Sequence, residues 1–176
     1  MNSVRERADK ARQAARILAA SPSESRGKAL EAVSLAMGER RPSILAANEL
    51  DMAVARELVE TGELSTPLLN RLDISGNKLD SVISMIHSIG AQPEPLENTS
   101  MATELDEGLN LFRVSVPIGV IGVIFESRPD ALVQIACLCL KSGNAIVLKG
   151  GREAEHTNKI LAEIITEATS KIKEIP

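Results

Sequence analysis

Two short runs of β-branched residues, separated by a helical segment, constrain the fold more than any other feature of this sequence. Residues 118–125 are a nearly unbroken run of Ile and Val with interspersed glycines, typical of a strand buried on both faces. Residues 144–149 are a second such run, and Pro129 stands at a favourable first-turn position of the helix between them. Strand, helix and strand in this order predict a βαβ unit with parallel strands, and hence an α/β fold.

The carboxyl ends of these two strands carry the most distinctive side chains. Ligands of parallel sheets bind beyond the carboxyl ends of the strands, so residues 125–128 and 149–153 should lie side by side at one edge. Lys149 could reach a ribose or phosphate, and Arg152 could pair with a 2′-phosphate. Between them, Gly150 and Gly151 would let the backbone approach a ligand. The alternative is a plain Gly-Gly turn before a solvated helix start.

Ser127 has two possible roles on pattern alone. It directly follows Phe125 and Glu126 at the end of the first strand, just before Pro129. In one interpretation its hydroxyl caps the helix that begins at Pro129. In the other, the hydroxyl and the neighbouring backbone amides contact an anion or a developing oxyanion. Residues 119–122 do not form a G-x-G-x-x-G motif, so an ordinary dinucleotide fingerprint is absent.

Composition excludes several classes of function. A net charge of −4 and only two aromatic residues argue against nucleic-acid binding, which requires a basic face or stacking platforms. The sequence has no apolar run of the roughly 20 residues that a membrane helix needs. Cys137 and Cys139 are two residues apart inside the predicted helix, so we expect core side chains in a reducing cytoplasm, with no disulfide and no metal site.

The residues before the βαβ unit predict a series of helices. The first spans residues 4–20, and Ser21, Pro22 and Glu24 form a capping-box pattern that starts the second. Asn48 with Asp51 could cap a third helix, and further helices are expected from residues 65 and 75. Residues 91–100 are expected to be a loop, and 109–116 a partly exposed strand after a turn at 106–108.

We therefore divide the chain into a helical region, residues 1–105, and a second region, residues 106–176. The second region holds a strand, the βαβ unit and a final amphipathic helix over residues 155–173. Apolar parallel strands need neighbours on both edges, and the sequence ends where a third strand is due. A truncated protein, or one half of a split protein, is the expectation.

Two stretches resemble one enzyme family closely. They read Glu-Ser-Arg-Pro-Asp-Ala-Leu-Val-Gln-Ile-Ala at 126–136 and Lys-Ser-Gly-Asn-Ala-Ile-Val-Leu-Lys-Gly-Gly-Arg-Glu-Ala at 141–154. Both are similar to γ-glutamyl phosphate reductases (glutamate-5-semialdehyde dehydrogenases) of the aldehyde dehydrogenase superfamily, and especially to the reductase half of pyrroline-5-carboxylate synthases. The resemblance is strongest over residues 109–154 and is weaker but collinear over the N-terminal helices. It implies the N-terminal part of a Rossmann-type cofactor domain.

The resemblance also implies an activity: NADPH-dependent reduction of γ-glutamyl phosphate to glutamate-5-semialdehyde and phosphate, a step of proline biosynthesis. A cysteine thiolate attacks the acyl phosphate in this family, and hydride then reduces the thioester. The implied enzyme is cytoplasmic and, at full length, homo-oligomeric, with the strand after residue 109 contributing to an oligomerisation hairpin.

Matching the family's motif residue by residue gives each site residue an implied role. Lys149 corresponds to the lysine that contacts the adenosine ribose, and Arg152 lies near the position where NAD-preferring relatives carry a carboxylate. Phe125 and Glu126 correspond to the loop that passes the nicotinamide, and Ser127 lies at or beside an oxyanion-hole asparagine.

The family's nucleophilic cysteine has no counterpart up to residue 176, so we expect this chain alone to be inactive. The alternatives are a non-catalytic nucleotide-binding module and one half of a split enzyme.

Overall fold

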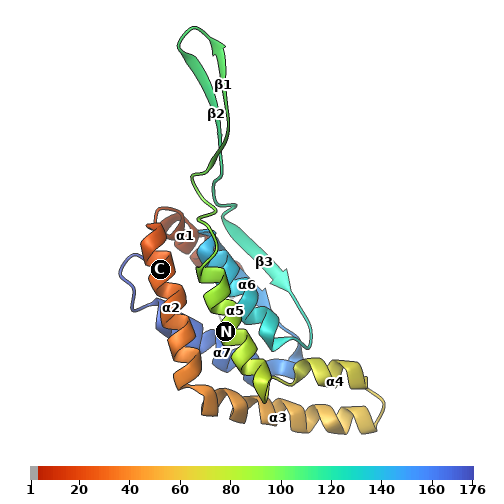
Figure 1. The fold of residues 1–176 in the computed structure, drawn as a ribbon. Coiled ribbons are helices and arrows are strands. Elements are labelled where there is room, and N and C mark those ends of the chain that lie inside the picture. The colour runs from red at the N-terminus through yellow and green to blue at the C-terminus, as the bar shows by residue number, and fades with distance from the viewer. Residues whose placement is uncertain (1–3) are drawn as a thin grey trace.

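A two-stranded hairpin projects from a body of helices in the computed structural model, which describes residues 4–176 (Figure 1). The elements in chain order are α1 (Val4–Ala19), α2 (Ser23–Glu39), α3 (Arg41–Glu60), α4 (Thr66–Leu72), α5 (Asn77–Gly90), β1 (Thr99–Asp106), β2 (Leu109–Val114), β3 (Val120–Ile124), α6 (Pro129–Lys141), β4 (Ala145–Lys149), the 3₁₀ turn η1 (Arg152–Ala154) and α7 (Glu155–Thr169). Within residues 4–176 no helix is both long and apolar enough to cross a membrane.

The predicted βαβ unit is confirmed. Strands β3 and β4 pair in parallel from Val120 opposite Ala145 to Ile124 opposite Lys149, and α6 connects them. Pro129 occupies the first turn of α6, as its fixed φ angle favours.

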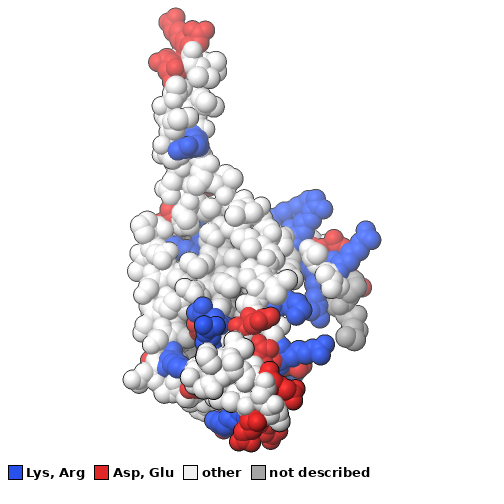
Figure 2. Space-filling view, turned by 90° about the vertical axis from the view of Figure 1, so that its right-hand side faces the viewer, with Lys and Arg blue, Asp and Glu red and all other residues white. Residues whose placement is uncertain are grey.

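The expectation that β3 is buried on both faces is wrong for the described residues. Val120 and Ile124, which point to the same side because strand side chains alternate, are 38% and 78% exposed. Ile118, just before β3, is exposed as well. Figure 2 looks onto the side of the molecule on which β3 lies in Figure 1, and the middle of that face carries few charged side chains.

The core lies among the helices. Helix α2 packs against α5 and α7, and α6 packs against the same two helices. The largest side chains in this core are almost fully buried: Leu30, Met37, Ile44, Leu79, Ile86, Leu161 and Ile164. At the edge of this core, His87 forms a 2.8 Å hydrogen bond with the Ser34 hydroxyl.

The predicted capping box at the start of α2 is wrong. The helix begins at Ser23, and no side chain caps it. The Ser21 hydroxyl instead donates to the Leu18 carbonyl oxygen at the end of α1 (2.6 Å). The buried Arg26 guanidinium donates to the Ser21 carbonyl and to the Glu94 carboxylate, so tertiary contacts replace the local cap.

The hairpin was only half predicted. β2 confirms most of the strand expected over residues 109–116, and Gly108 takes the positive φ angle (75°) of the expected turn. Its partner β1 falls partly in the segment expected to be a loop, so that part of the expectation is wrong. All residues of both strands are exposed. Because neither face of β1 is buried, its sequence need not alternate between apolar and polar residues, and this pattern was therefore not there to predict the strand. The division of the chain at residues 105 and 106 stays a prediction.

Asn48 and Asp51 lie inside α3 and do not cap it, so that prediction is wrong. The buried Asp51 carboxylate instead accepts hydrogen bonds at the N-terminus of α7, 105 and 106 residues further along the chain. Its donors are the His156 amide (3.1 Å) and ring Nδ1 (2.8 Å), and the Thr157 amide (2.7 Å) and hydroxyl (2.6 Å).

Asn48 extends this network to the segment after α4. Its side-chain amide donates to the Leu72 carbonyl oxygen (3.0 Å) and to the Thr157 hydroxyl oxygen (3.2 Å). Its oxygen accepts from the Ile74 amide (3.1 Å). We call this set of contacts the Asp51 clasp. It fixes where α7 begins and therefore where the segment leading out of β4 can run.

We expect Asp51→Ala to lower the free energy of unfolding by about 2–4 kcal/mol, because it leaves buried donors at the start of α7 without an acceptor. Urea denaturation followed by circular dichroism measures this change. Glu57→Ala is the matched control, since it removes an exposed carboxylate from the same helix. Equal stability of Asp51→Ala and Glu57→Ala would contradict the role of the clasp.

Candidate functional site

Two short segments at the carboxyl ends of β3 and β4 lie side by side, as the sequence predicted. We call residues 125–128 the serine turn and residues 149–152 the glycine turn. The Phe125 amide donates to the Lys149 carbonyl oxygen (3.1 Å), which extends the ladder by one bond. Beyond it, the Ser127 amide (2.5 Å) and hydroxyl (3.0 Å) both donate to one carboxylate oxygen of Glu153. The two turns therefore form one continuous edge.

Ser127 is held in an uncommon conformation. Its φ angle is 45°, in the left-handed region that disfavours residues other than glycine, and only 3% of the residue is exposed. The possibility that Ser127 caps α6 is wrong, because Arg128 occupies the cap position and no side chain caps the helix. The amide and hydroxyl do meet an anionic group, the chain's own Glu153 carboxylate. A contact between Ser127 and an oxyanion stays a prediction.

The glycine turn presents two cations. The side chains of Lys149 and Arg152 are exposed, and neither the ammonium nor the guanidinium group makes a hydrogen bond or ion pair with another of the described residues, 4–176. Arg152 is the first residue of η1, immediately before the clasped end of α7. Glu126 is exposed on the neighbouring serine turn, and Phe125 is half-buried beneath it.

Both glycines of the glycine turn lie against other side chains of this protein. A Cβ atom on Gly150 would lie 2.3 Å from the Asn158 side-chain nitrogen and 3.2 Å from the Phe125 ring. A Cβ on Gly151 would lie 2.1 Å from a Glu153 carboxylate oxygen. A side chain of this protein thus occupies the space over each glycine. The absence of a Cβ atom at these two positions lets the glycine turn and the serine turn lie close together.

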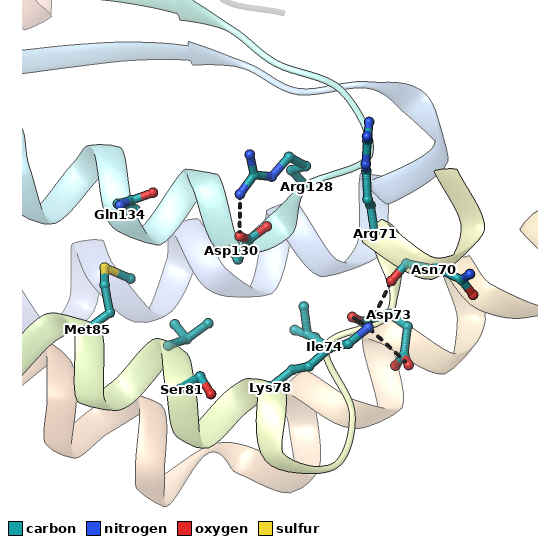
Figure 3. A pocket seen from close by; sticks show the side chains of 11 residues that line it. Asn70, Arg71, Asp73, Ile74, Lys78, Ser81, Met85, Arg128, Asp130 and Gln134 are labelled. Atoms are coloured by element: carbon teal, nitrogen blue, oxygen red, sulfur yellow. Dashed lines mark hydrogen bonds and ion pairs between the residues drawn. The ribbon is translucent and has the colours of Figure 1, made fainter. Parts of the chain in front are cut away.

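A cavity of about 590 Å³ opens next to the serine turn, between α4, α5 and α6 (Figure 3). Its charged lining consists of Arg71, Asp73, Lys78, Arg128 and Asp130. The Lys78 ammonium donates to the carbonyl oxygens of Asn70 and Asp73, both at 2.8 Å.

Arg128, which follows Ser127 in the chain, forms a 3.0 Å ion pair with Asp130 across this cavity wall. The hydrogen bond and charge of Asp130 raise the pKa of Arg128. The sequence did not indicate this cavity. Arg71 and Lys78 come from helices far from the serine turn in the sequence, and no local spacing signals that the fold brings them together.

Neither cysteine has the environment of a reactive thiol. Burial raises the pKa of Cys137 to about 12, and burial also raises the pKa of Cys139. Both are free thiols buried in α6, which confirms the expected role as core side chains. Within residues 4–176 no three His, Cys, Asp or Glu side chains are grouped so that they could hold a metal ion.

Comparisons of sequence match the chain to one group of enzymes. It is 54% identical over 93% of its length to a γ-glutamyl phosphate reductase of Natronomonas pharaonis, and 50% identical over 97% to one of Acetivibrio thermocellus. The chain spans 37% and 38% of the length of these curated relatives. No family model matches it.

Comparisons of structure agree with the sequence. The γ-glutamyl phosphate reductase of Saccharomyces cerevisiae superposes with a TM-score of 0.93 at 36% identity, over all of this chain and 45% of the yeast chain. A probable aldehyde dehydrogenase of Listeria monocytogenes superposes with a TM-score of 0.69 at 17% identity, over 98% of this chain and 34% of its own, which shows a shared fold alone. The resemblance to γ-glutamyl phosphate reductases, and the fold it implied, are confirmed.

Because burial raises both thiol pKa values, we expect the folded chain to react very slowly with a disulfide reagent at pH 8. At a pKa of about 12, about one Cys137 side chain in ten thousand is a thiolate at that pH. Two thiols should appear once urea unfolds the chain, as absorbance of the released thiolate reports. Rapid labelling of either cysteine in the native protein would contradict the buried assignment.

Proposed function

We propose that this chain, which matches γ-glutamyl phosphate reductases in sequence and fold over nearly all its length, forms part of such an enzyme. The proposed reaction is the NADPH-dependent reduction of L-glutamyl 5-phosphate to glutamate-5-semialdehyde and phosphate, in proline biosynthesis in the cytoplasm. The observation that carries the proposal is 54% identity over 93% of the chain. The reaction, substrate and cofactor of the whole enzyme are inferred from that match and from the chemistry of the two turns.

The glycine turn is the proposed NADPH contact. Lys149 and Arg152 are exposed cations at the carboxyl end of a parallel strand, where nucleotides bind in open α/β sheets. An arginine suits a 2′-phosphate, because its guanidinium can donate two hydrogen bonds to the same phosphate. NADPH would supply the hydride. In this chain Lys149 would hold the ribose and Arg152 the 2′-phosphate, with Phe125 and Glu126 beside the path to the nicotinamide.

The cavity beside the serine turn is the proposed substrate contact. γ-Glutamyl phosphate carries an acyl phosphate, a carboxylate and an ammonium group, so its site needs charges of both signs. Arg71, Lys78 and Arg128 supply the positive charges. Asp73 and Asp130 supply the negative charges on the same wall. The volume of about 590 Å³ is within the range of small-molecule sites.

The thiol nucleophile is proposed to come from polypeptide outside this chain. Cys137 and Cys139 are buried in α6, and their raised pKa values oppose thiolate formation. The open apolar side of β3, with Ile118 83% and Ile124 78% exposed, favours a further segment packed on it. Such a segment would be continuous with this chain or would belong to a separate half of the enzyme. We also expect the whole enzyme to be a homo-oligomer.

We expect Arg152→Glu in an intact reductase with this sequence to raise the dissociation constant for NADPH at least about tenfold, because a charge-assisted hydrogen bond becomes a repulsion. The constant for NADH should change little, since NADH has no 2′-phosphate. Fluorescence titration with both nucleotides measures the difference.

Lys159→Glu is the control, because it makes the same charge reversal at an exposed position of α7. We expect it to leave both constants near their original values. Equal weakening of NADPH and NADH by Arg152→Glu would remove the 2′-phosphate role.

The 176-residue chain alone should show no NADPH-dependent reduction of γ-glutamyl phosphate, because neither of its thiols is ionised and accessible. Loss of NADPH absorbance measures turnover, with an intact γ-glutamyl phosphate reductase as the positive control. Turnover by the isolated chain that survives Cys137→Ser and Cys139→Ser would overturn the assignment of a cysteine mechanism. Turnover that one of these substitutions abolishes would identify that cysteine as the nucleophile.

A further inference from the structure

We propose that Glu153 is a positioning residue that couples the glycine turn to the serine turn, so that a ligand held by Arg152 alters the geometry of Ser127. The identity of that ligand as an NADPH-type nucleotide rests on the proposed function. The coupling itself rests on contacts within the chain. Glu153 touches neither proposed ligand directly and acts through the two turns.

The contact between Glu153 and Ser127 is specific. One oxygen of the carboxylate accepts from both the amide (2.5 Å) and the hydroxyl (3.0 Å) of Ser127, 26 residues earlier in the chain. Hydrogen bonds to an ionised acceptor are about twice as strong as neutral ones. They hold Ser127 at its φ angle of 45°, a conformation that is strained for residues other than glycine. Without the carboxylate, this strain has no compensating interaction.

The Glu153 carboxylate also rests on the glycine turn. Its two oxygens would lie 2.1 and 2.2 Å from a Cβ atom on Gly151, so a side chain at this position would force the carboxylate to move. Arg152 and Glu153 are consecutive residues of the single turn η1. A shift of the Arg152 backbone toward a bound phosphate would therefore move the backbone that carries Glu153.

The Asp51 clasp restricts the movement of η1 on one side and so determines the direction in which a displacement of η1 is transmitted. Its hydrogen bonds to the amides of His156 and Thr157 fix the first turn of α7 directly behind η1. A shift of η1 is thus opposed at its C-terminal side, where a buried carboxylate would have to lose its donors. The Ser127 contact lies on the other side of η1. Ser127 in turn precedes Arg128, which lines the cavity.

The coupling is tested first without any ligand, by hydrogen exchange of the Ser127 amide in the 176-residue chain measured by NMR. We expect Glu153→Ala to reduce protection of this amide at least about tenfold, as loss of a hydrogen bond to a charged acceptor implies. Gly151→Ala should reduce it similarly, because the new methyl group displaces the carboxylate. The double variant should lose no more than either single variant.

Two further variants separate this link from a general loss of stability. Glu153→Gln keeps an acceptor oxygen and should restore part of the protection. Glu155→Ala removes an exposed carboxylate two residues further on and should leave the Ser127 amide unchanged. Additive losses in the double variant, or an equal loss in Glu155→Ala, would overturn the proposal.

The functional step is tested by titrating the chain with adenosine 2′,5′-bisphosphate. In the unaltered chain the amide resonances of Arg152 and Ser127 should shift together, and in Glu153→Ala only that of Arg152 should shift. A Ser127 resonance that stays fixed in the unaltered chain while Arg152 responds, or that still shifts in Glu153→Ala, would overturn the coupling. If neither resonance responds, the proposed nucleotide site is wrong, and the ligand-free variants alone decide the link between Glu153 and Ser127.

Discussion

One buried carboxylate, that of Asp51, determines how the helical region and the βαβ unit fit together. Its side chain is 3% exposed and accepts from two backbone amides, a hydroxyl and a histidine ring. A buried charge is tolerated only when such donors replace water, and the N-terminus of a helix adds a favourable dipole. Because these donors belong to the start of α7, the hydrogen bonds of Asp51 fix the position at which the segment between β4 and α7 ends.

The arrangement of the two turns follows from this constraint. The glycine turn is bounded by β4 on one side and by the clasped start of α7 on the other, so its few residues have little freedom. Within it, Glu153 reaches back to Ser127 and completes an edge that continues into the cavity wall at Arg128. Cations exposed on the glycine turn and mixed charges in the cavity thus lie on either side of one strained serine.

The parts of the fold that were predictable are those with local signals. Pro129 and the β-branched runs identified β3, α6 and β4, because proline geometry and the strand preference of β-branched residues act within a few residues. Local patterns gave wrong predictions of helix caps at Ser21 and at Asn48 with Asp51. Those residues have capping chemistry, but their partners are the end of the preceding helix and a helix more than 100 residues away. Nothing in the spacing of side chains along α3 indicates such a partner.

The candidate site was predictable to a similar degree. That residues 125–128 and 149–153 meet followed from the parallel pairing, whereas the use of the Ser127 hydroxyl by Glu153 depends on side-chain geometry that a pattern does not contain. The cavity cations on α4 and α5 have no signal in the sequence, since they face the serine turn only after α5 packs on α6. The apolar sequence of β3 predicts a strand covered on both faces, whereas one side of β3 is exposed in the structure.

The most direct measurement of the central proposal is a crystal structure of this chain with adenosine 2′,5′-bisphosphate. We expect the 2′-phosphate within hydrogen-bonding distance of the Arg152 guanidinium and the ribose at the Lys149 ammonium, beyond the carboxyl end of β4. A nucleotide bound elsewhere, with Lys149 and Arg152 still free, would contradict the assignment of the glycine turn.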